Sequence, residues 1–372
     1  MNVPDTCVDD LEATLRLTLV PGVGPRTRRV LLEHFANAAA VLAAAPSQLR
    51  AIPGIGPKLT RAITQARDMD VRPILADCDE HGLEVVTDTE DLYPRLLREI
   101  HDPPGVLFVR GPLRPADAVA VAIVGTRHAS HYGLRQAERL ARGLARAGVT
   151  VVSGLARGID AAAHRGALAA GGRTVAVLAS GLLEVYPPEH RELADQVASS
   201  GALVSESPPR SAPRSGAFPQ RNRLITGLSL GVVVVEAGQR SGALISAEHA
   251  MEQGREVFAV PGRVDNAAAR GCHRLLRDGA KLVECVEDIL DELGPLMEPA
   301  LRADGSCLRS VAELQLNAQE QAVLAAVLST PTNIDDVVLR SGLPIQRVLA
   351  TLSVLEMRRL VRRISGSLVA RP

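Results

Sequence analysis

The stretch that decides the fold is Phe218–Gly262, which reads FPQRNRLITGLSLGVVVVEAGQRSGALISAEHAMEQGREVFAVPG. Its apolar run Gly231–Glu236 predicts a buried strand, and a helical pattern begins soon afterwards at Ser241–Gly242. In an open α/β sheet, ligands bind beyond the carboxyl ends of the strands. A helix that begins there with small residues presents free N–H groups and the positive end of its dipole. Because Arg221 and Arg223 lie just upstream, the stretch predicts a phosphate-binding site without an obvious catalytic group.

Alternating strand and helix signals continue on both sides of this stretch. The predicted strands are Leu83–Val86, Val119–Val124, Val149–Ser153, Thr174–Leu178, Leu203–Ser205, Gly231–Glu236 and Glu256–Val260. The predicted helices are Tyr132–Ala147, Ile159–Ala170, Pro188–Ser199, Ala243–Gln253 and Gly271–Asp278. Unbroken apolar strands separated by helices are typical of a parallel sheet that is covered on both faces. We therefore expect a doubly wound α/β domain over residues 71–293.

An internal repeat occupies the first part of the chain. Pro21–Leu31 reads PGVGPRTRRVL, and Pro53–Ile63 reads PGIGPKLTRAI. Each copy has the form of a glycine hairpin that enters a helix, which predicts a tandem helix-hairpin-helix domain over residues 1–70. Glycines at a helix start leave N–H groups free for a DNA phosphate, although such pairs also serve as packing modules. The possible secondary DNA contacts are Gly22, Gly24, Gly54, Gly56 and Lys58.

The C-terminal part has the element order of a winged helix. Residues 294–317 lack periodicity and are predicted to be a linker. The domain over residues 318–372 has predicted helices at Ala318–Leu328, Ile334–Ser341 and Ile345–Arg358, followed by a hairpin over Leu360–Ala370. The third helix is expected to expose Gln346, Arg347, Arg358 and Arg359. Such a helix can bind DNA or dock onto another protein, and the sequence favours neither role.

Composition limits the classes of function. The 42 Lys and Arg residues balance 42 Asp and Glu, so a nucleic-acid surface has to come from local clustering of charge. Aromatic residues are only 2% of the chain, which argues against a surface built mainly on base stacking. The five cysteines have no metal-binding spacing, which indicates a reducing cytosol and no metal. Without a signal pattern or a membrane-length apolar run, we expect a cytoplasmic protein.

Small residues and an arginine follow two neighbouring strands of the predicted sheet, Val119–Val124 and Val149–Ser153. Gly125–Thr126–Arg127 follows the first, and a turn that begins Ser153–Gly154 and contains Arg157 follows the second. Each segment alone resembles an ordinary βα turn, but together with Arg221 and Arg223 they would line one crevice. Arginine suits phosphate oxygens, and glycine lets the backbone approach them. No dinucleotide or P-loop fingerprint is present, so no cofactor is expected.

Three titratable residues near this crevice have both a catalytic and a structural interpretation. Asp160 and His164 lie four apart on one helix face and could form a general acid–base pair. We favour a structural role in which Asp160 supports the helix start and His164 bonds to it. Glu236, at a strand end, is the other candidate carboxylate, and we expect it to brace Arg221 or Arg223 by a bidentate pair.

At these residues the chain resembles the DNA-processing protein A (DprA/Smf) family. The motifs are VGTRHASHYG (Val124–Gly133), SGLARGIDAAAH (Ser153–His164), FPQRNRLITGLS (Phe218–Ser229), VVVVEAGQRSGALISA (Val232–Ala247) and VFAVPG (Val257–Gly262). They occur in order over about Val119–Val283, and both flanking modules also fit the family. The chain departs from the usual pattern at Ala179, Leu183 and His190, beside the predicted pocket.

The resemblance implies an extended Rossmann-like, mainly parallel sheet that binds single-stranded DNA without catalysis. Such proteins act in natural transformation and recombination, protect single strands, help to load RecA recombinase and form homodimers. Carried onto this chain, the DNA pocket would use Arg127, Ser153, Gly154, Arg157, Arg221, Arg223, Ser241 and Gly242.

Two other functions compete with this one. A Rossmann-like nucleotide phosphoribohydrolase would carry a PGGxGTxxE signature, whereas the matching region here reads EAGQRSGALISAE and lacks the paired glycines. A winged-helix transcription regulator with a ligand-sensing domain is the third hypothesis.

Overall fold

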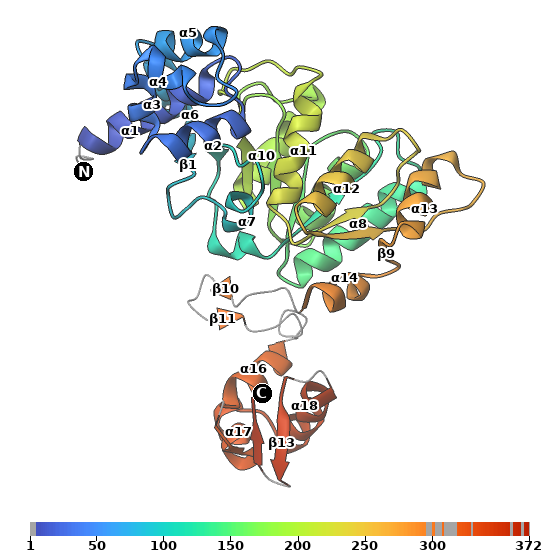
Figure 1. Cartoon of the computed structure of the whole chain (residues 1–372). Helices are drawn as coiled ribbons and strands as arrows, with labels where there is room; N and C mark the ends of the chain where they lie inside the picture. The colour runs from blue at the N-terminus through green and yellow to red at the C-terminus, as the bar shows by residue number, and fades with distance from the viewer. Residues whose placement is uncertain are drawn as a thin grey trace. The chain divides into compact units, whose positions relative to one another are not determined.

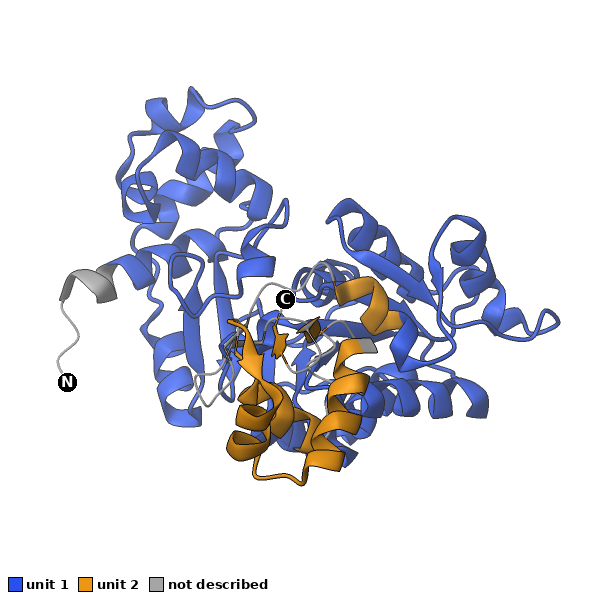
Figure 2. Cartoon of the chain, turned by 90° about the horizontal axis from the view of Figure 1, so that it is seen from below, with its two compact units in different colours: residues 1–288 blue, residues 289–372 orange. Residues whose placement is uncertain are grey.

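The computed structural model describes residues 5–294, 300–301, 307–308, 318–328, 330–357, 360–365 and 368–371 (Figure 1). The chain forms two compact units, residues 1–288 and residues 289–372 (Figure 2). The first unit contains the hairpin repeat and the large sheet, and the second contains the winged-helix elements.

A nine-stranded sheet with the order β1-β2-β6-β5-β4-β3-β7-β8-β9 forms the centre of the first unit. The strands are β1 Glu84–Thr87, β2 Val106–Arg110, β3 Ala120–Val124, β4 Thr150–Ser153, β5 Thr174–Val177, β6 Ala202–Ser205, β7 Gly231–Val234, β8 Glu256–Ala259 and β9 Lys281–Leu282. All neighbours from β6 to β9 pair in parallel, whereas β1–β2 and β2–β6 are antiparallel. The prediction of a mainly parallel sheet is confirmed. Two strands were not predicted: β2, which lies between β1 and β6, and β9, which forms the edge beyond β8.

Helices cover both faces of this sheet. The helices that follow β3, β4 and β5 are α8 His131–Arg146, α9 Ile159–Ala169 and α10 Arg191–Ser200, and those that follow β6, β7 and β8 are α11 Ala217–Gly227, α12 Gly242–Glu252 and α13 Arg270–Arg277. Alternate residues of one strand face opposite layers: Val175 and Val177 pack with α11 and α12, whereas Ala176 packs with α9 and α10. Right-handed crossovers give this division, because the chain progresses from β3 to β6 and then returns to β7. Helix α11 was not among the predicted elements.

The hairpin repeat folds as predicted. Its helices are α1 Asp5–Leu19, α2 Pro25–His34, α3 Ala38–Ala43, α4 Pro46–Arg50 and α5 Pro57–Ala66. Both hairpin helices begin at a proline after a glycine cap. Gly22 and Gly54 adopt φ angles of 93° and 86°, a left-handed conformation that side chains other than glycine rarely take. The remaining helices of this unit include α6 Arg72–His81 and α7 Arg95–Arg98, and α14 spans Val286–Leu293.

The two copies of the repeat have different surroundings. Arg28, in the first copy, is buried and makes a bidentate pair with Asp88 at 2.7 and 2.9 Å. The corresponding residue of the second copy is Thr60, whose hydroxyl donates to the Gly56 carbonyl of its own hairpin at 3.1 Å. A Cβ added at Gly54 or Gly56 would meet no described atom within 4 Å. The first copy is therefore tied to the loop after β1, and the second presents an open turn.

The second unit has the predicted order of a winged helix. Its main elements are α16 Ala318–Ala326, β12 Thr332–Asn333, α17 Ile334–Ser341, α18 Ile345–Met357, β13 Arg362–Ser365 and β14 Leu368–Ala370, and a separate pair is formed by β10 Ala300–Leu301 and β11 Cys307–Leu308. Gln346 and Arg347 are exposed as expected, whereas Arg358 and Arg359 lie outside the described residues. Most of the predicted linker, 294–317, also lies outside them. No helix in the described part of the chain is long and apolar enough to cross a membrane.

Candidate nucleic-acid interface

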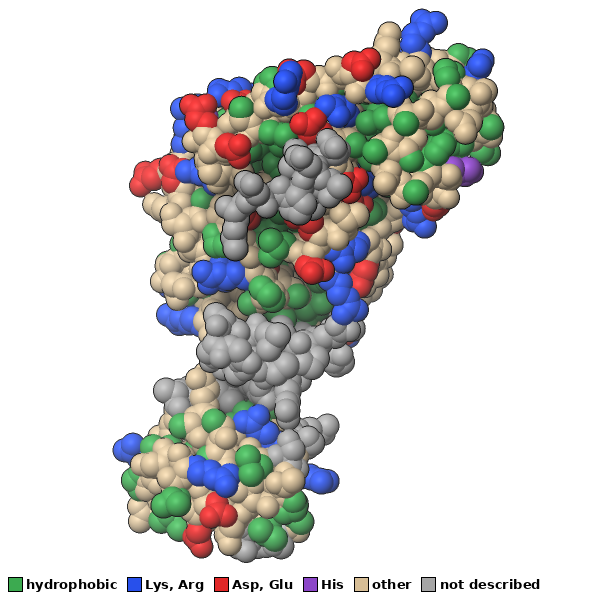
Figure 3. Space-filling view, turned by 90° about the vertical axis from the view of Figure 1, so that its left-hand side faces the viewer, with side chains coloured by type: hydrophobic (Ala, Val, Ile, Leu, Met, Phe, Trp, Pro, Cys, Tyr) green, Lys and Arg blue, Asp and Glu red, His purple; other side chains and the backbone are tan. Residues whose placement is uncertain are grey.

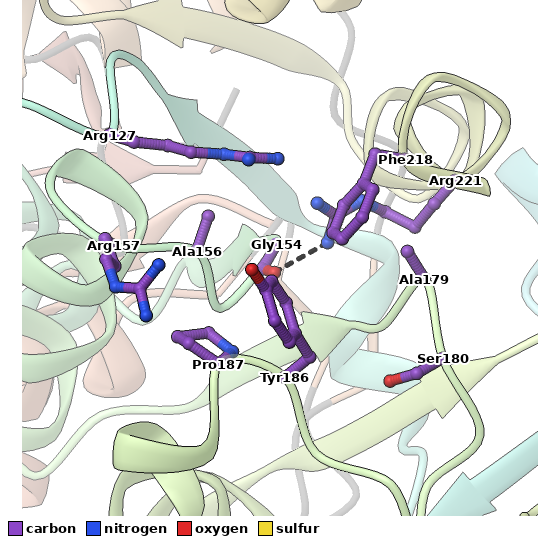
Figure 4. A pocket seen from close by; sticks show the side chains of 10 residues that line it. All are labelled: Arg127, Gly154, Ala156, Arg157, Ala179, Ser180, Tyr186, Pro187, Phe218 and Arg221. Atoms are coloured by element: carbon purple, nitrogen blue, oxygen red, sulfur yellow. Dashed lines mark hydrogen bonds between the residues drawn. The ribbon is translucent and has the colours of Figure 1, made fainter. Parts of the chain in front are cut away.

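A crevice of about 730 Å³ opens at the carboxyl ends of β3 and β4. The loop after β3 and the start of α9 form one side, and α11 and the beginning of α12 form the other. Of the predicted residues, Arg127, Arg221, Ser241 and Gly242 line this crevice. Gly154 and Arg157 line a smaller recess that adjoins it (Figure 4). Loops that are distant in sequence therefore meet at the strand ends, as the order of the strands requires.

Arg221 forms the floor of this site. Its side chain is buried, and Nη1 donates hydrogen bonds to the carbonyl oxygens of Gly154, at 2.6 Å, and of Val177. A Cβ on Gly154 would lie 2.3 Å from that nitrogen, so any larger residue there would displace the guanidinium from its two carbonyl partners. Burial lowers the pKa of Arg221 to about 10, which leaves the guanidinium charged at neutral pH. Arg221 therefore supplies a fixed positive charge beneath the crevice.

Asp160 holds the same turn from its other side. Its buried Oδ2 accepts hydrogen bonds from the backbone N–H groups of Gly154, at 3.1 Å, and Ala156, at 3.4 Å. Burial raises the pKa of this carboxyl, while the charge of Arg221 and the two N–H groups oppose that shift. Asp160 at the start of α9 thus fixes the shape of the Gly154 turn.

The prediction that His164 bonds to Asp160 is wrong. The His164 ring lies on the same helix but turns towards β5, where Nδ1 bonds to Thr174 Oγ1 at 2.7 Å. Burial lowers the pKa of His164 to about 3, so the ring is neutral at physiological pH. A spacing of four residues places Asp160 and His164 on one face of the helix, but it does not determine which residues of other elements each side chain contacts.

Glu236 does not brace either arginine, which corrects the second expectation. Its Oε2 accepts a hydrogen bond from the Ser130 N–H at 2.8 Å, and its Oε1 accepts one from Asn266 Nδ2 at 3.2 Å. Strand β7 ends next to β3, so the carboxylate meets the start of α8, whose free N–H groups and positive dipole end attract it. Gly133 on the first turn of α8 leaves space for this carboxylate.

Arg223 lies outside the crevice. It points away from Arg221 because two positions on a helix differ by about 200°. Its guanidinium pairs with Glu206 and donates to the carbonyl oxygen of Asp102 at 2.7 Å. It lines a separate cavity of about 530 Å³ beside Arg28. Ser153 is not at the surface of the crevice either, because its buried hydroxyl donates to the Ile123 carbonyl at 2.6 Å.

Two aromatic residues that the sequence analysis did not select lie at the centre of the recess (Figure 4). Phe218, on the first turn of α11, and Tyr186 meet edge to face with ring centroids 5.7 Å apart. The guanidinium carbon of Arg127 lies 4.9 Å from the Phe218 ring centroid, a cation–π contact. Arg127 is exposed and makes no ion pair with the residues that the structure describes. A cation and an aromatic face are thus presented together.

Arg157 is engaged by an acidic neighbour. Its Nε lies 2.5 Å from Glu189 Oε1, and both side chains are about half exposed. The hydrogen bond to Glu189 raises the pKa of Arg157. Beside it, His190 Nδ1 bonds to the carbonyl of Leu155, whose φ of 57° is rare for a residue other than glycine. His190 therefore holds the loop that carries Arg157.

The start of α12 is open towards the crevice. Ser241 caps the helix by accepting from the Ala243 N–H at 3.3 Å, and Asn222 donates to the Gly242 carbonyl at 3.3 Å. A Cβ at Gly242 would meet no described atom within 4 Å. Helix N–H groups, the positive dipole end, Arg127 and the Phe218 ring can together take a phosphate and an adjoining base. The described residues contain no group of three His, Cys, Asp or Glu that could hold a metal ion.

Models of three protein families match the chain. The model for DNA recombination-mediator protein A matches residues 84–294, which are more than half of the chain. The SAM-like helix-hairpin-helix tandem matches residues 14–67, and the DprA winged helix domain matches residues 309–367.

Relatives and solved structures agree with these matches. Protein Smf of Synechocystis sp. is 36% identical over 93% of this chain and 95% of that protein. The X-ray structure of DNA processing protein A from Streptococcus pneumoniae has a TM-score of 0.64 at 34% identity and covers 78% of this chain and 99% of that one. DNA processing protein A from Helicobacter pylori, whose structure gives insights into a unique single-stranded DNA binding mode, has a TM-score of 0.51 at 30% identity and covers 57% and 95%. The chain therefore belongs to the DNA recombination-mediator protein A family.

Proposed function

We propose that this protein binds single-stranded DNA in the crevice and carries out no chemistry on it. The observation that carries this proposal is Arg127, which is exposed, stacked on Phe218 and next to the open start of α12. In a single strand the bases are free to stack on an aromatic face while the phosphates meet the cation and the helix N–H groups. In a duplex the bases are paired inside and cannot reach Phe218.

Two further findings support this function. The H. pylori relative is described by its single-stranded DNA binding mode. In the present chain, the carboxylates of Asp160 and Glu236 and the ring of His164 are engaged in structural hydrogen bonds at the strand ends. Because these were the candidate catalytic groups, their engagement favours a binding role over phosphoribohydrolase chemistry.

We also infer, from the family, that the protein acts in the cytoplasm as a homodimer, in DNA uptake and recombination, and helps to load a RecA-type recombinase on the bound strand. Sedimentation equilibrium at the concentrations that bind DNA measures the mass directly, and the mass of a single chain would contradict the dimer. On a single strand that is already coated with a single-strand-binding protein, the recombinase assembles after a lag. Addition of the present protein should shorten that lag. An unchanged lag would contradict the loading role.

The protein should bind an oligothymidylate at least tenfold more tightly than a duplex of equal length, because only the single strand presents unpaired bases. Fluorescence anisotropy with labelled DNA measures both affinities. For the single strand, log K should fall against log salt with a slope of about 0.7 for each phosphate neutralised. Equal affinity for the duplex, or no dependence on salt, contradicts a single-strand crevice of this kind.

Arg127→Ala should weaken single-strand binding by about 1.5–3 kcal/mol, the range for hydrogen bonds to charged groups. Arg223→Ala is the matched control, because that arginine is itself buried, lies outside the crevice and pairs with the partly buried Glu206. We expect Arg223→Ala to lower the free energy of unfolding, since it leaves the partly buried carboxylate of Glu206 unpaired, while DNA affinity measured below the melting temperature stays near wild type. Lys58→Ala, at the exposed second hairpin, should cost less than Arg127→Ala because solvent and salt screen it. If Arg223→Ala abolishes binding and Arg127→Ala does not, the site assignment is wrong.

Glu189→Gln should strengthen single-strand binding two- to fivefold, because it releases Arg157 from an acidic competitor worth about 0–1 kcal/mol at the surface. Glu192→Gln is the control: this residue is exposed on the first turn of α10, and among the described residues its side chain bonds only to Gln196, at 3.4 Å. Titrations at one salt concentration compare the two variants. Identical affinities for both would show that the pair with Arg157 does not compete with DNA.

A further inference from the structure

A line of arginines runs along the outer face of α8. Arg135, Arg139, Arg142 and Arg146 follow one another at spacings of four, three and four residues, which places them on one stripe of the helix. All four are exposed, whereas Ala137, Leu140 and Leu144 on the opposite side of the helix are buried in the core. The four arginines line a groove of about 520 Å³, together with the segment Cys285–Glu287.

Most of this positive charge has no acidic partner. Arg139 donates to Gln136 Oε1 and to the carbonyl of Glu284. Arg135, Arg142 and Arg146 make no ion pair or side-chain hydrogen bond with the residues that the structure describes. Glu138 precedes Arg142 by four residues, the spacing that favours a helical ion pair, yet no pair forms. Four cations thus face two carboxylates in this groove, Glu138 and Glu287.

The stripe begins at the rim of the crevice. His128 lines the crevice, and α8 begins three residues later at His131, which is exposed and lies on the same stripe as the arginines. The helix has 16 residues, so the stripe extends roughly 24 Å from that rim at 1.5 Å per residue. Successive arginines are about one turn apart, 5–6 Å. A solvated polar face would serve solubility alone, but it would not require unpaired charge of one sign continuous with a binding crevice.

We propose that this face of α8 is a second nucleic-acid contact, which takes the phosphates of the strand segment that leaves the crevice. The proposal rests on single-strand binding in the crevice. Arginine's planar fork suits phosphate oxygens, and a contact to phosphates alone tolerates any base sequence. The groove contributes length to the binding site, whereas the crevice contributes the stacking contacts.

The test compares two oligothymidylates. One has about 6 nucleotides and is meant to occupy the crevice alone, and the other has about 20 nucleotides and is long enough to reach the α8 groove as well. The variant Arg135→Gln/Arg142→Gln/Arg146→Gln should bind the short strand like wild type and the long strand at least tenfold more weakly at low salt. Its salt slope for the long strand should fall by about 2, which is three phosphates at 0.7 each. The control Arg67→Gln/Arg191→Gln/Arg270→Gln removes the same charge from exposed positions on other elements and should change neither affinity by more than twofold.

Each outcome has a separate meaning. Failure of the wild type to bind the short strand would overturn the crevice function itself. Normal binding of the short strand shows that the triple variant is folded, so an unchanged affinity for the long strand would overturn the α8 contact. Equal losses in both triple variants would also overturn it, because long-range charge would then explain the effect. Polyglutamate is the second probe. If the α8 triple variant binds polyglutamate more weakly than wild type but binds both DNA strands normally, the groove takes acidic peptides and the proposal is wrong.

Discussion

The buried guanidinium of Arg221 is the interaction on which the site depends. At the ends of β4 and β5, Arg221 donates hydrogen bonds to the carbonyl oxygens of both Gly154 and Val177. Asp160 accepts from the N–H of the same Gly154. The turn is therefore held by charged groups on both sides of its backbone, which fixes its shape before any ligand arrives. Such preorganisation reduces the ordering cost of binding.

The position of the crevice could be predicted from the sequence, whereas the direction of several side chains could not. Unbroken apolar runs locate the strands, and small residues with arginines after them locate the ligand edge, so Arg127, Gly154 and the start of α12 come together as expected. The prediction that Arg223 lines the crevice is wrong because residues 217–227 form a helix, which the sequence pattern does not indicate. On a loop, two neighbouring arginines can point the same way, but on a helix residues i and i+2 diverge.

The contacts of Glu236 and His164 could not be predicted for a related reason. Their partners, Ser130 and Thr174, lie on neighbouring elements whose register is set by the tertiary fold. The aromatic pair is a different case. An aromatic content of 2% argued against stacking, but an average over the chain does not describe one site. Phe218 and Tyr186 are two of the seven Phe and Tyr residues, and they meet in the same recess.

Buried and exposed arginines have different roles in this protein. Arg28, Arg221 and Arg223 are buried, and each donates hydrogen bonds to a carboxylate or to backbone carbonyls, so they shape the fold and contribute little to attracting a polyanion. The chain has a formal net charge of +0, and on the face of the first unit seen in Figure 3 basic and acidic side chains are interspersed. A binding surface can arise in such a protein where exposed cations make no ion pair and outnumber the carboxylates near them. Arg127 at the crevice and the stripe on α8 meet that condition, and their continuity along the β3–α8 connection gives a strand one path across a molecule with no overall charge.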